Sequence, residues 1–302
     1  MLSKNLFVIA GPTASGKTSL AITLAGLLRT EIISADSRQF YREMNIGTAK
    51  PSPEELARIP HHFIGHISVH DDYDAGKFGQ DALSRISALF LTYDNLVMAG
   101  GSGLYIDAVC KGFDELPDVD AAIREELTRI YKEKGLGPLR ELLKKHDPVH
   151  YQASDVNNPH RLIRALEICI GTGLPYSSFR KGKGKQRDFN VITIGLDPGR
   201  ELLYARINER VDRMMKAGLA DEARNLLGLR HLNALQTVGY KELFDHFENK
   251  LGLDEAVQKI KQNTRNFAKR QMTWFRKDKT INWFDPAQES EIIRFVKTRP
   301  CP

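Results

Sequence analysis

Hydrophobic residues form short continuous runs along two parts of the chain, before residue 102 and again near residue 190. The runs cover 6–10, 31–36, 95–101 and 191–196, and each is typical of a strand that is buried on both faces. A helical pattern over 19–28 follows the first run, and helical stretches separate the later ones. Because strands that alternate with helices form parallel sheets, we predict an α/β fold with a parallel sheet flanked by helices.

The pattern changes over 116–187, where helical segments replace the strand-like runs. Glycine or proline interrupts these segments at Gly135, Gly137, Pro148 and Gly171. The clearest helix is capped by Asn158, has Pro159 at its first position, and is expected to stop at the last of these glycines. We therefore predict a core in two parts, 1–115 and 188–302 with C-terminal helices, and a helical insertion domain between them. The run from Lys181 to Lys185 predicts a mobile linker.

The composition is that of an ordinary globular protein. Of 302 residues, 41% are hydrophobic and 27% are charged, which excludes collagen-like, low-complexity and wholly disordered chains. Apolar runs stay far below the roughly eighteen residues of a membrane span, and the N-terminus shows no secretory leader. Cys110, Cys169 and Cys301 lie far apart and outside any CxxC motif, so we expect small buried thiols and neither disulfides nor zinc. A cytoplasmic protein without a membrane partner fits best.

The charge is mildly basic, with a formal net charge of +6. Five basic residues and no acidic one lie between Arg180 and Arg187, and eight basic residues lie between Glu255 and Lys279. Such runs occur on surfaces that bind polyanions and on surfaces that face only water.

A phosphate-binding motif follows the first strand. Gly11-Pro-Thr-Ala-Ser-Gly-Lys-Thr18 matches G-x-x-x-x-G-K-[ST] in the required context, between a strand and a helix. Backbone amides of such a loop face an anion, while the lysine supplies a positive charge and the threonine a hydroxyl for Mg²⁺. The expected anion-binding residues are Gly11, Thr13, Ala14, Ser15, Gly16, Lys17 and Thr18.

Polar residues also follow the second and third strands. Asp36 and Gly100-Gly-Ser102 should reach the same sheet edge as the phosphate loop, because the strands are parallel. Asp36 fits a ligand-facing carboxylate, a helix cap or an indirect magnesium contact. The glycines fit either a close approach to a ligand, with the Ser102 hydroxyl at the mouth of the site, or a plain turn. A magnesium nucleotide would suit the loop equally well, so a kinase with Asp36 as base is a full alternative.

Six motifs, in this order, carry a family resemblance. They are Gly11-Pro-Thr-Ala-Ser-Gly-Lys-Thr18, Ile33-Ser-Ala-Asp-Ser-Arg-Gln-Phe-Tyr41, Met44-Asn-Ile-Gly-Thr-Ala-Lys-Pro51, Gly100-Gly-Ser-Gly-Leu-Tyr105, Asn158-Pro-His-Arg-Leu-Ile-Arg-Ala-Leu-Glu167 and Thr237-Val-Gly-Tyr240. From Asn5 to about Trp283 the chain closely resembles bacterial tRNA dimethylallyltransferases. The resemblance implies transfer of a dimethylallyl group from dimethylallyl diphosphate to N6 of the adenine 3′-adjacent to the anticodon of tRNA, with Mg²⁺ and the phosphate loop holding the diphosphate.

The resemblance also implies individual roles. Asp36 would be the general base on the amine, Ser102 would lie near the reacting centre, and Lys17 and Thr18 would contact diphosphate and metal. Ser102 stands where many members have threonine, and the hydroxyl is retained. Either Arg206 or Arg210 would contact the diphosphate. Contacts to tRNA are implied for Asp36, Ser37, Arg38, Gln39, Ser102, Arg124, His160, Arg161, Arg164, Thr237, Gly239 and Tyr240.

The helix over 159–170 bears on the choice between a tRNA dimethylallyltransferase and a kinase. Arg161 and Arg164 project from it opposite an apolar face, and the family places this segment against the anticodon loop. A pair of solvated arginines fits the pattern too.

A second helix, over 255–277, aligns Ala256, Ile260, Phe267 and Trp274 as a packing face. Lys261, Arg265, Lys269 and Arg276 form a basic stripe on another face, which suits contacts to RNA phosphates. Core packing is the expected role of Trp274, with stacking on a base as the alternative.

Other features carry no expected chemistry. His61 and His62 would point to opposite faces of a strand, so we expect no metal there. Met214 and Met215 belong to an amphipathic helix that ends near Gly218 and should pack in the core. A P-loop nucleotide or metabolite kinase, a non-catalytic RNA-binding switch and a prenyltransferase of free adenine nucleotides stay open as alternatives, and no protein partner is implied.

Overall fold

The computed structural model describes residues 4–180, 182 and 184–298. The chain divides after residue 111 and after residue 186 into two compact units, which we call the core unit and the helical unit. Both divisions lie within four residues of the boundaries predicted at 115 and 187. Lys181 and Lys183 of the predicted linker, and Cys301, lie outside the described residues.

A six-stranded parallel sheet forms the centre of the core unit, with strand order β3-β2-β4-β1-β5-β6. The strands are β1 (Asn5–Ala10), β2 (Ile32–Ser34), β3 (His61–His62), β4 (Asn95–Gly100), β5 (Asn190–Leu196) and β6 (Asn282–Phe284). The four central strands are the four that the hydrophobic runs predict. The two edge strands have the sequences His-His in β3 and Asn-Trp-Phe in β6, and neither is part of a continuous apolar run.

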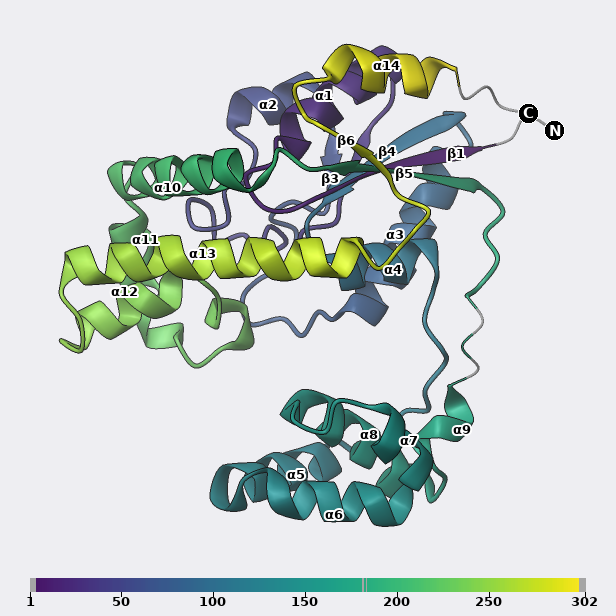
Figure 1. Ribbon diagram of the computed structural model, residues 1–302, viewed down its shortest axis with the longest axis vertical. Helices are drawn as coiled ribbons and strands as arrows, with labels where there is room; N and C mark the ends of the chain where they lie inside the picture. Colours follow the sequence, from purple (N-terminus) through teal and green to yellow (C-terminus); the bar gives the residue numbers. More distant parts are fainter. Residues whose placement is uncertain (1–3, 181, 183, 299–302) are drawn as a thin grey trace. The chain divides into compact units, whose positions relative to one another are not determined.

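Both faces of the sheet are covered by helices, which explains the continuous apolar runs in its central strands. Along β1, Leu6, Val8 and Ala10 pack on the side of α3 (Ala75–Leu89) and α4 (Gly103–Cys110). Phe7 and Ile9 pack on the opposite side, with α1 (Lys17–Leu28) and α14 (Glu289–Lys297). Figure 1 shows these two helical layers. The alternation follows from the period of two along a strand.

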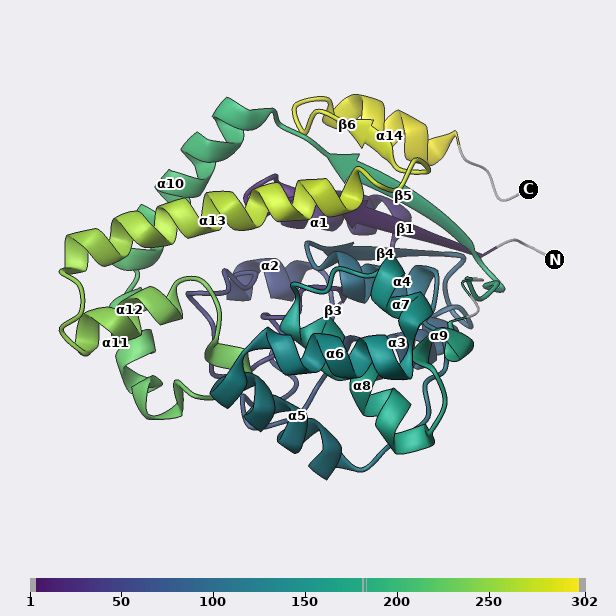
Figure 2. The ribbon, with the colours of Figure 1, turned by 60° about the horizontal axis from the view of Figure 1, so that its bottom comes forward.

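Further helices of the core unit surround the carboxyl ends of the strands. They are α2 (Pro53–Arg58), α10 (Arg200–Lys216), α11 (Leu219–Asn225), α12 (Tyr240–Phe247) and α13 (Leu253–Phe275), with short 3₁₀ turns η1 (Leu227–Leu229) and η2 (Asn233–Leu235). The long helix α13 runs beside α10 and α12, as Figures 1 and 2 show. Met214 and Met215 of α10 pack against the cluster between these helices, as predicted.

The helical unit contains α5 (Ala121–Lys134), α6 (Leu136–His146), α7 (Pro148–Ala153), α8 (Pro159–Thr172) and α9 (Tyr176–Phe179). Leu127, Leu139 and Leu166 belong to a hydrophobic cluster of its own.

Asn158 caps α8 as predicted, because its side chain accepts the backbone N–H of Arg161 at 3.3 Å. The predicted end at Gly171 is wrong. That glycine lies inside the helix, where its missing side chain makes room for Val119, and α8 ends at Gly173 with a φ of 71°.

Among the residues that the structure describes, the buried Cys169 and the half-buried Cys110 are free thiols. Burial raises the pKa of the Cys110 thiol to about 12. Within the described ranges, no helix combines the length and the apolar character that crossing a membrane requires.

Candidate active site

A cavity of about 680 Å³ lies in the core unit where β1, β2 and β4 end. Thr13, Lys17 and Thr18 line it from the phosphate loop and the start of α1. Segments 36–39 and 100–105 line it from the neighbouring strand ends, and α10 and α13 close it from outside the sheet. The parallel sheet thus brings together the three predicted segments, which are far apart in the sequence.

The phosphate loop is shaped by residues with positive φ, namely Gly16 at 97° and Ala14 at 63°. Lys17 follows as the first residue of α1, and its ammonium group donates a 2.6 Å hydrogen bond to the carbonyl oxygen of Pro12. Burial lowers the pKa of Lys17 to about 8; the Asp36 carboxylate opposes this shift and the Arg210 guanidinium adds to it. These three side chains therefore form one electrostatic cluster.

Asp36 is held at the end of β2 by its own turn. Its Oδ1 accepts the backbone N–H of Arg38 at 3.1 Å. The next residue, Ser37, donates its backbone N–H to Ser102 Oγ at 3.0 Å, and the two hydroxyl groups are 3.1 Å apart. Gly100 permits this approach, because a Cβ there would overlap the carbonyl group of Ala35. Ser102 is thus bonded to the residue that follows Asp36, and both Asp36 and Ser102 line the cavity.

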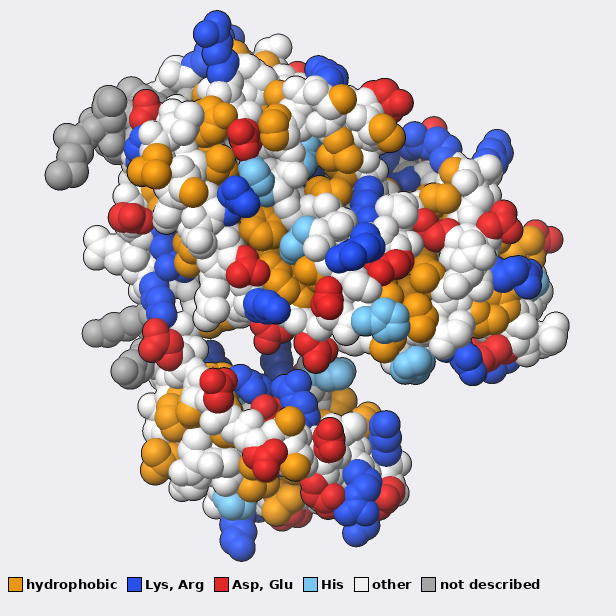
Figure 3. Space-filling model, turned by 180° about the vertical axis from the view of Figure 1, so that it is seen from behind, with side chains coloured by type: hydrophobic (Ala, Val, Ile, Leu, Met, Phe, Trp, Pro, Cys, Tyr) orange, Lys and Arg blue, Asp and Glu red, His pale blue; other side chains and the backbone are white. Residues whose placement is uncertain are grey.

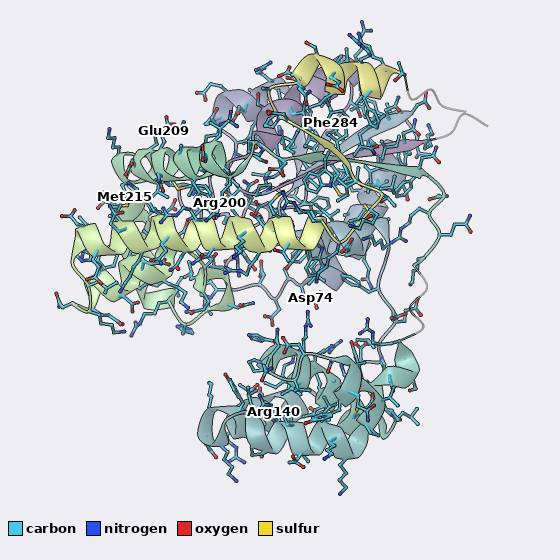
Figure 4. All side chains as sticks on the ribbon, viewed as in Figure 1. Asp74, Arg140, Arg200, Glu209, Met215 and Phe284 are labelled. Carbon is cyan, nitrogen blue, oxygen red and sulfur yellow. The ribbon has the colours of Figure 1, made fainter. Side chains whose placement is uncertain are left out.

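Of the two candidate arginines, Arg210 lines the cavity and Arg206 does not. Both lie on α10, which Figure 4 marks with the labels Arg200 and Glu209. Burial lowers the pKa of Arg210, and the nearby Asp36 carboxylate opposes this shift. Of these two arginines, Arg210 is therefore the one that an anion in the cavity would meet.

Residue Gln271, from α13, was not expected in this site. It is 8% exposed. Its Oε1 accepts the backbone N–H of Thr13 at 2.8 Å, and its Nε2 donates to the carbonyl oxygen of Gly101 at 2.9 Å. The signal in the sequence is weak: an amide occurs on a helix face whose other members are mainly apolar.

The predicted packing face of α13 needs correction. Ala256 and Ile260 are buried, but Phe267 and Trp274 are 39% and 38% exposed and line the cavity. The indole N–H of Trp274 donates to Asp107 Oδ2 at 3.0 Å. The core instead uses Ala268, Met272 and Phe275, because the helix is rotated so that its aromatic face points to the cavity.

The structure also corrects the role of Tyr240, whose side chain is 0% exposed. Its hydroxyl donates to Glu222 Oε1 at 2.6 Å, and the same carboxylate accepts the backbone N–H groups of Asn45, Ile46 and Gly47. Tyr240 therefore supports this loop and does not offer its side chain to RNA. Its neighbours Thr237 and Gly239 line the cavity.

Two further predicted tRNA contacts, Arg38 and Gln39, have partners within the protein. The Arg38 guanidinium donates to the carbonyl oxygens of Asn233 and Ala234, both at 3.0 Å. The Gln39 amide donates to the carbonyl oxygen of Ala49 at 3.1 Å. Both side chains line the cavity and hold adjacent loops in place.

In the helical unit, Glu167 is buried between two predicted contact residues. Its carboxylate binds Arg124 at 2.8 Å and Arg164 at 2.7 Å. Arg161 and His160 are exposed. In Figure 3, the Lys and Arg side chains of this unit are interspersed with Asp and Glu on the face shown. Arg164 is thus engaged in an ion pair although its side chain is 41% exposed, and Arg161 is exposed as well.

Two residues of the basic stripe on α13 are bonded to side chains of α10. Lys261 forms a 2.6 Å ion pair with Asp212, and its side chain is only 14% exposed. Arg265 donates to Asn208 Oδ1 at 2.7 Å. Lys269 is exposed. The stripe therefore does not lie wholly open to solvent.

A metal ion in the cavity would find few protein ligands. His62 pairs with Glu31 at 2.6 Å, and His61 Nδ1 lies 2.7 Å from the carbonyl oxygen of Ile59. In the part of the chain that the structure describes, no three His, Cys, Asp or Glu side chains are grouped to hold a metal. Thr18, which carries a hydroxyl group, lines the cavity. One protein hydroxyl fits a Mg²⁺ ion whose other ligands are phosphate oxygens and water.

The parallel sheet and the loop from Gly11 to Thr18 define a P-loop α/β protein. A sequence model of the family described as IPP transferase matches residues 39–278, most of the chain. The chain therefore belongs to the IPP transferase family, which confirms the resemblance.

Several relatives are similar over almost their whole length. The chain is 54% identical over 292 residues to the tRNA dimethylallyltransferase of Christiangramia forsetii, with 97% of each chain covered. It is 48% identical to tRNA dimethylallyltransferase 1 of Phocaeicola vulgatus, which covers 96% of this chain and 97% of the relative.

Two solved structures share the fold. The tRNA isopentenylpyrophosphate transferase of Bacillus halodurans has a TM-score of 0.73 at 38% identity, with 98% of this chain and 96% of that chain covered. A eukaryotic dimethylallyltransferase acting on tRNA has a TM-score of 0.82 at 25% identity, with 99% of this chain and 81% of that chain covered.

Proposed function

We propose that the protein transfers a dimethylallyl group from dimethylallyl diphosphate to N6 of the adenine 3′-adjacent to the anticodon in tRNA. The observation that carries this proposal is the convergence of Lys17, Asp36, Ser102 and Arg210 on one cavity. Relatives that cover nearly the whole chain are named tRNA dimethylallyltransferases, which supports the choice of substrates.

The cations of the cavity suit a diphosphate leaving group. As the bond between the prenyl C1 and the diphosphate oxygen breaks, negative charge develops on the diphosphate. Lys17, Arg210 and the amides of the phosphate loop would stabilise that charge where it appears. Mg²⁺, held through the diphosphate and the Thr18 hydroxyl, would add positive charge at the same oxygens.

The carboxylate suits the amine. N6 of adenine forms the new bond to C1 and must lose one proton, which we assign to Asp36. Oδ1 of Asp36 is engaged by the backbone N–H of Arg38, so Oδ2 is the atom that would accept the proton. The Ser102 hydroxyl, 3.0 Å from the Ser37 nitrogen, keeps this turn in place beside the reacting atoms.

The target base must leave the stack of the anticodon loop to enter the cavity, at a cost of a few kcal/mol. Contacts to the surrounding RNA would offset this cost. Arg161 and Lys269 are suited to phosphate contacts because both are exposed.

The decisive experiment offers unmodified tRNA and Mg²⁺ with either dimethylallyl diphosphate or ATP, followed by mass spectrometry of the RNA. We expect the mass of one dimethylallyl group from the first donor and no change from ATP. Phosphate transfer from ATP to a small acceptor, with unmodified RNA, would establish a kinase instead. Prenylation of free adenine nucleotides but not of tRNA would restrict the proposal to a smaller substrate.

A further inference from the structure

The buried amide of Gln271 joins two loops that β1 and β4 deliver to the cavity. Oε1 accepts the backbone N–H of Thr13 in the phosphate loop at 2.8 Å. Nε2 donates to the carbonyl oxygen of Gly101, in the turn before α4, at 2.9 Å. A Cβ at Gly101 would overlap this amide, so glycine is required for the turn to come this close. The side chain thus spans the two loops with both ends bonded.

The Gly101 end of the bridge continues to the carboxylate. Ser102 follows Gly101 and accepts the backbone N–H of Ser37 at 3.0 Å, and Ser37 follows Asp36. The Thr13 end belongs to the loop that ends in Lys17. One chain of hydrogen bonds and short backbone links therefore connects the diphosphate side of the cavity with the side of the general base.

We propose that Gln271 is a positioning residue that holds the phosphate loop and the turn at Gly101 in one register. This inference rests on the proposed function: a donor bound at Lys17 and an amine beside Asp36 react only when their atoms are aligned. A displacement of about 1 Å between such groups can cost on the order of 10²-fold in rate. Gln271 touches neither reacting group in this scheme and acts through the two loops.

Burial makes the amide specific for this task. Its neighbours on the buried side of α13 include Ala268, Met272 and Phe275, so an apolar side chain would pack there at lower desolvation cost. A buried amide is stabilising only when its donor and its acceptor both find partners. Gln271 finds one partner in each loop.

Three variants separate the bridge from a general packing role. Gln271→Met keeps the length of the side chain and removes both bonds. Gln271→Glu keeps an acceptor for the Thr13 N–H but places oxygen against the Gly101 carbonyl. Gln262→Met is the matched control, because Gln262 is an exposed glutamine on the same helix.

Two measurements test the kinetic consequence. Steady-state prenylation of tRNA gives kcat and the KM of both substrates, and calorimetric titration with inorganic diphosphate and Mg²⁺ gives the Kd of diphosphate. We expect kcat to fall by about 10²-fold in Gln271→Met and by about 10-fold in Gln271→Glu. Both KM values and the Kd for diphosphate should stay within about threefold, and Gln262→Met should match the parent. An unchanged kcat, or a loss carried mainly by KM or by the diphosphate Kd, would overturn the proposal.

Hydrogen exchange followed by mass spectrometry tests the bridge without the reaction. Gln271→Met should exchange faster by about fivefold at 11–16 and at 100–103 together, with other segments of the core unit unchanged. Faster exchange in only one loop, or throughout the unit, would contradict a bridge. If the parent fails to prenylate tRNA, the proposed function is wrong and the positioning role falls with it, whereas the exchange result still decides whether Gln271 couples the two loops.

Discussion

Lys17 donates a hydrogen bond of 2.6 Å to the carbonyl oxygen of Pro12, five residues earlier in the same loop. This contact turns the ammonium group back across the loop that it belongs to. Burial of this ammonium group lowers the pKa of Lys17 to about 8. The charge that an anion would meet in the cavity therefore depends on pH in an accessible range.

Diphosphate affinity should fall as the pH rises through 8. Above this pKa Lys17 is mostly neutral in the free protein, so binding of the anion must be accompanied by uptake of a proton. The Kd of inorganic diphosphate should therefore increase by up to about tenfold per pH unit above pH 8. Calorimetric titration between pH 7 and 10 measures this, and Lys17→Met corrects for ionisation of the ligand. Parallel pH profiles for parent and variant would show that Lys17 does not titrate here.

Arg210 should contribute to diphosphate binding and Arg206 should not. Only Arg210 lines the cavity, although the two residues are one helical turn apart. A hydrogen bond to a charged group is typically worth about 1.5 to 3 kcal/mol, so Arg210→Ala should raise the Kd by about 10- to 100-fold. Arg206→Ala serves as the matched variant. A larger increase in Kd for Arg206→Ala than for Arg210→Ala would mean that α10 is rotated about its axis so that Arg206 faces the cavity.

Asp36→Asn should lower kcat by about 10²- to 10⁴-fold, the usual contribution of a general base. Asparagine keeps an oxygen that can accept the Arg38 N–H, so the turn and the affinity for tRNA should be retained. Single-turnover kinetics and a tRNA titration measure the two quantities. Asp254→Asn, at an exposed position of α13, is the control. Near-parental turnover would remove Asp36 from the reaction and leave it as a structural residue of the turn.

The sequence predicted the sheet because its signals are local. β1 is apolar from Leu6 to Ala10 because successive side chains such as Leu6 and Phe7 face opposite helical layers, and the glycine loop directly follows it. The cap at Asn158 is equally local. These features depend on neighbouring residues and on the direction of parallel strands.

Features that depend on how distant helices dock could not be predicted. Periodicity places Arg206 and Arg210 on nearly the same face of α10, and only the packing of that helix selects the second. The exposure of Trp274 and Tyr240 also depends on how helices dock, and both predictions were wrong. The first was expected in the core and lines the cavity, whereas the second was expected at the RNA and is 0% exposed. Gln271 becomes meaningful only when its two partners, 258 and 170 residues away, are known.

Tyr240→Phe should cost about 1 kcal/mol of stability and leave tRNA affinity unchanged. The variant removes one hydrogen bond to Glu222 within a buried cluster. Glu222→Gln should cost more, about 3 kcal/mol, because an amide nitrogen would then face backbone N–H donors of residues 45–47. Urea unfolding measures both free energies. A Tyr240→Phe variant with parental stability and weakened tRNA binding would instead support a direct contact.

The salt dependence of tRNA affinity should separate exposed cations from paired ones. Each cation that neutralises a phosphate adds roughly 0.7 to 0.9 to the slope of log affinity against log salt. Arg161 and Lys269 are exposed, so replacing either with alanine should flatten the slope by about that amount. Lys261 is bound to Asp212 at 2.6 Å, so Lys261→Ala should lower stability and leave the slope unchanged.

Titration of tRNA at several salt concentrations gives the slope for each variant. Binding of inorganic diphosphate is the control, because Arg161, Lys261 and Lys269 are not among the residues that line the cavity. Diphosphate affinity should be parental in all three. A flatter slope for Lys261→Ala would mean that the ion pair with Asp212 opens to RNA. Parental slopes for Arg161→Ala and Lys269→Ala would mean that these side chains only face water, and the RNA would then have to follow a path that avoids both α8 and this part of α13.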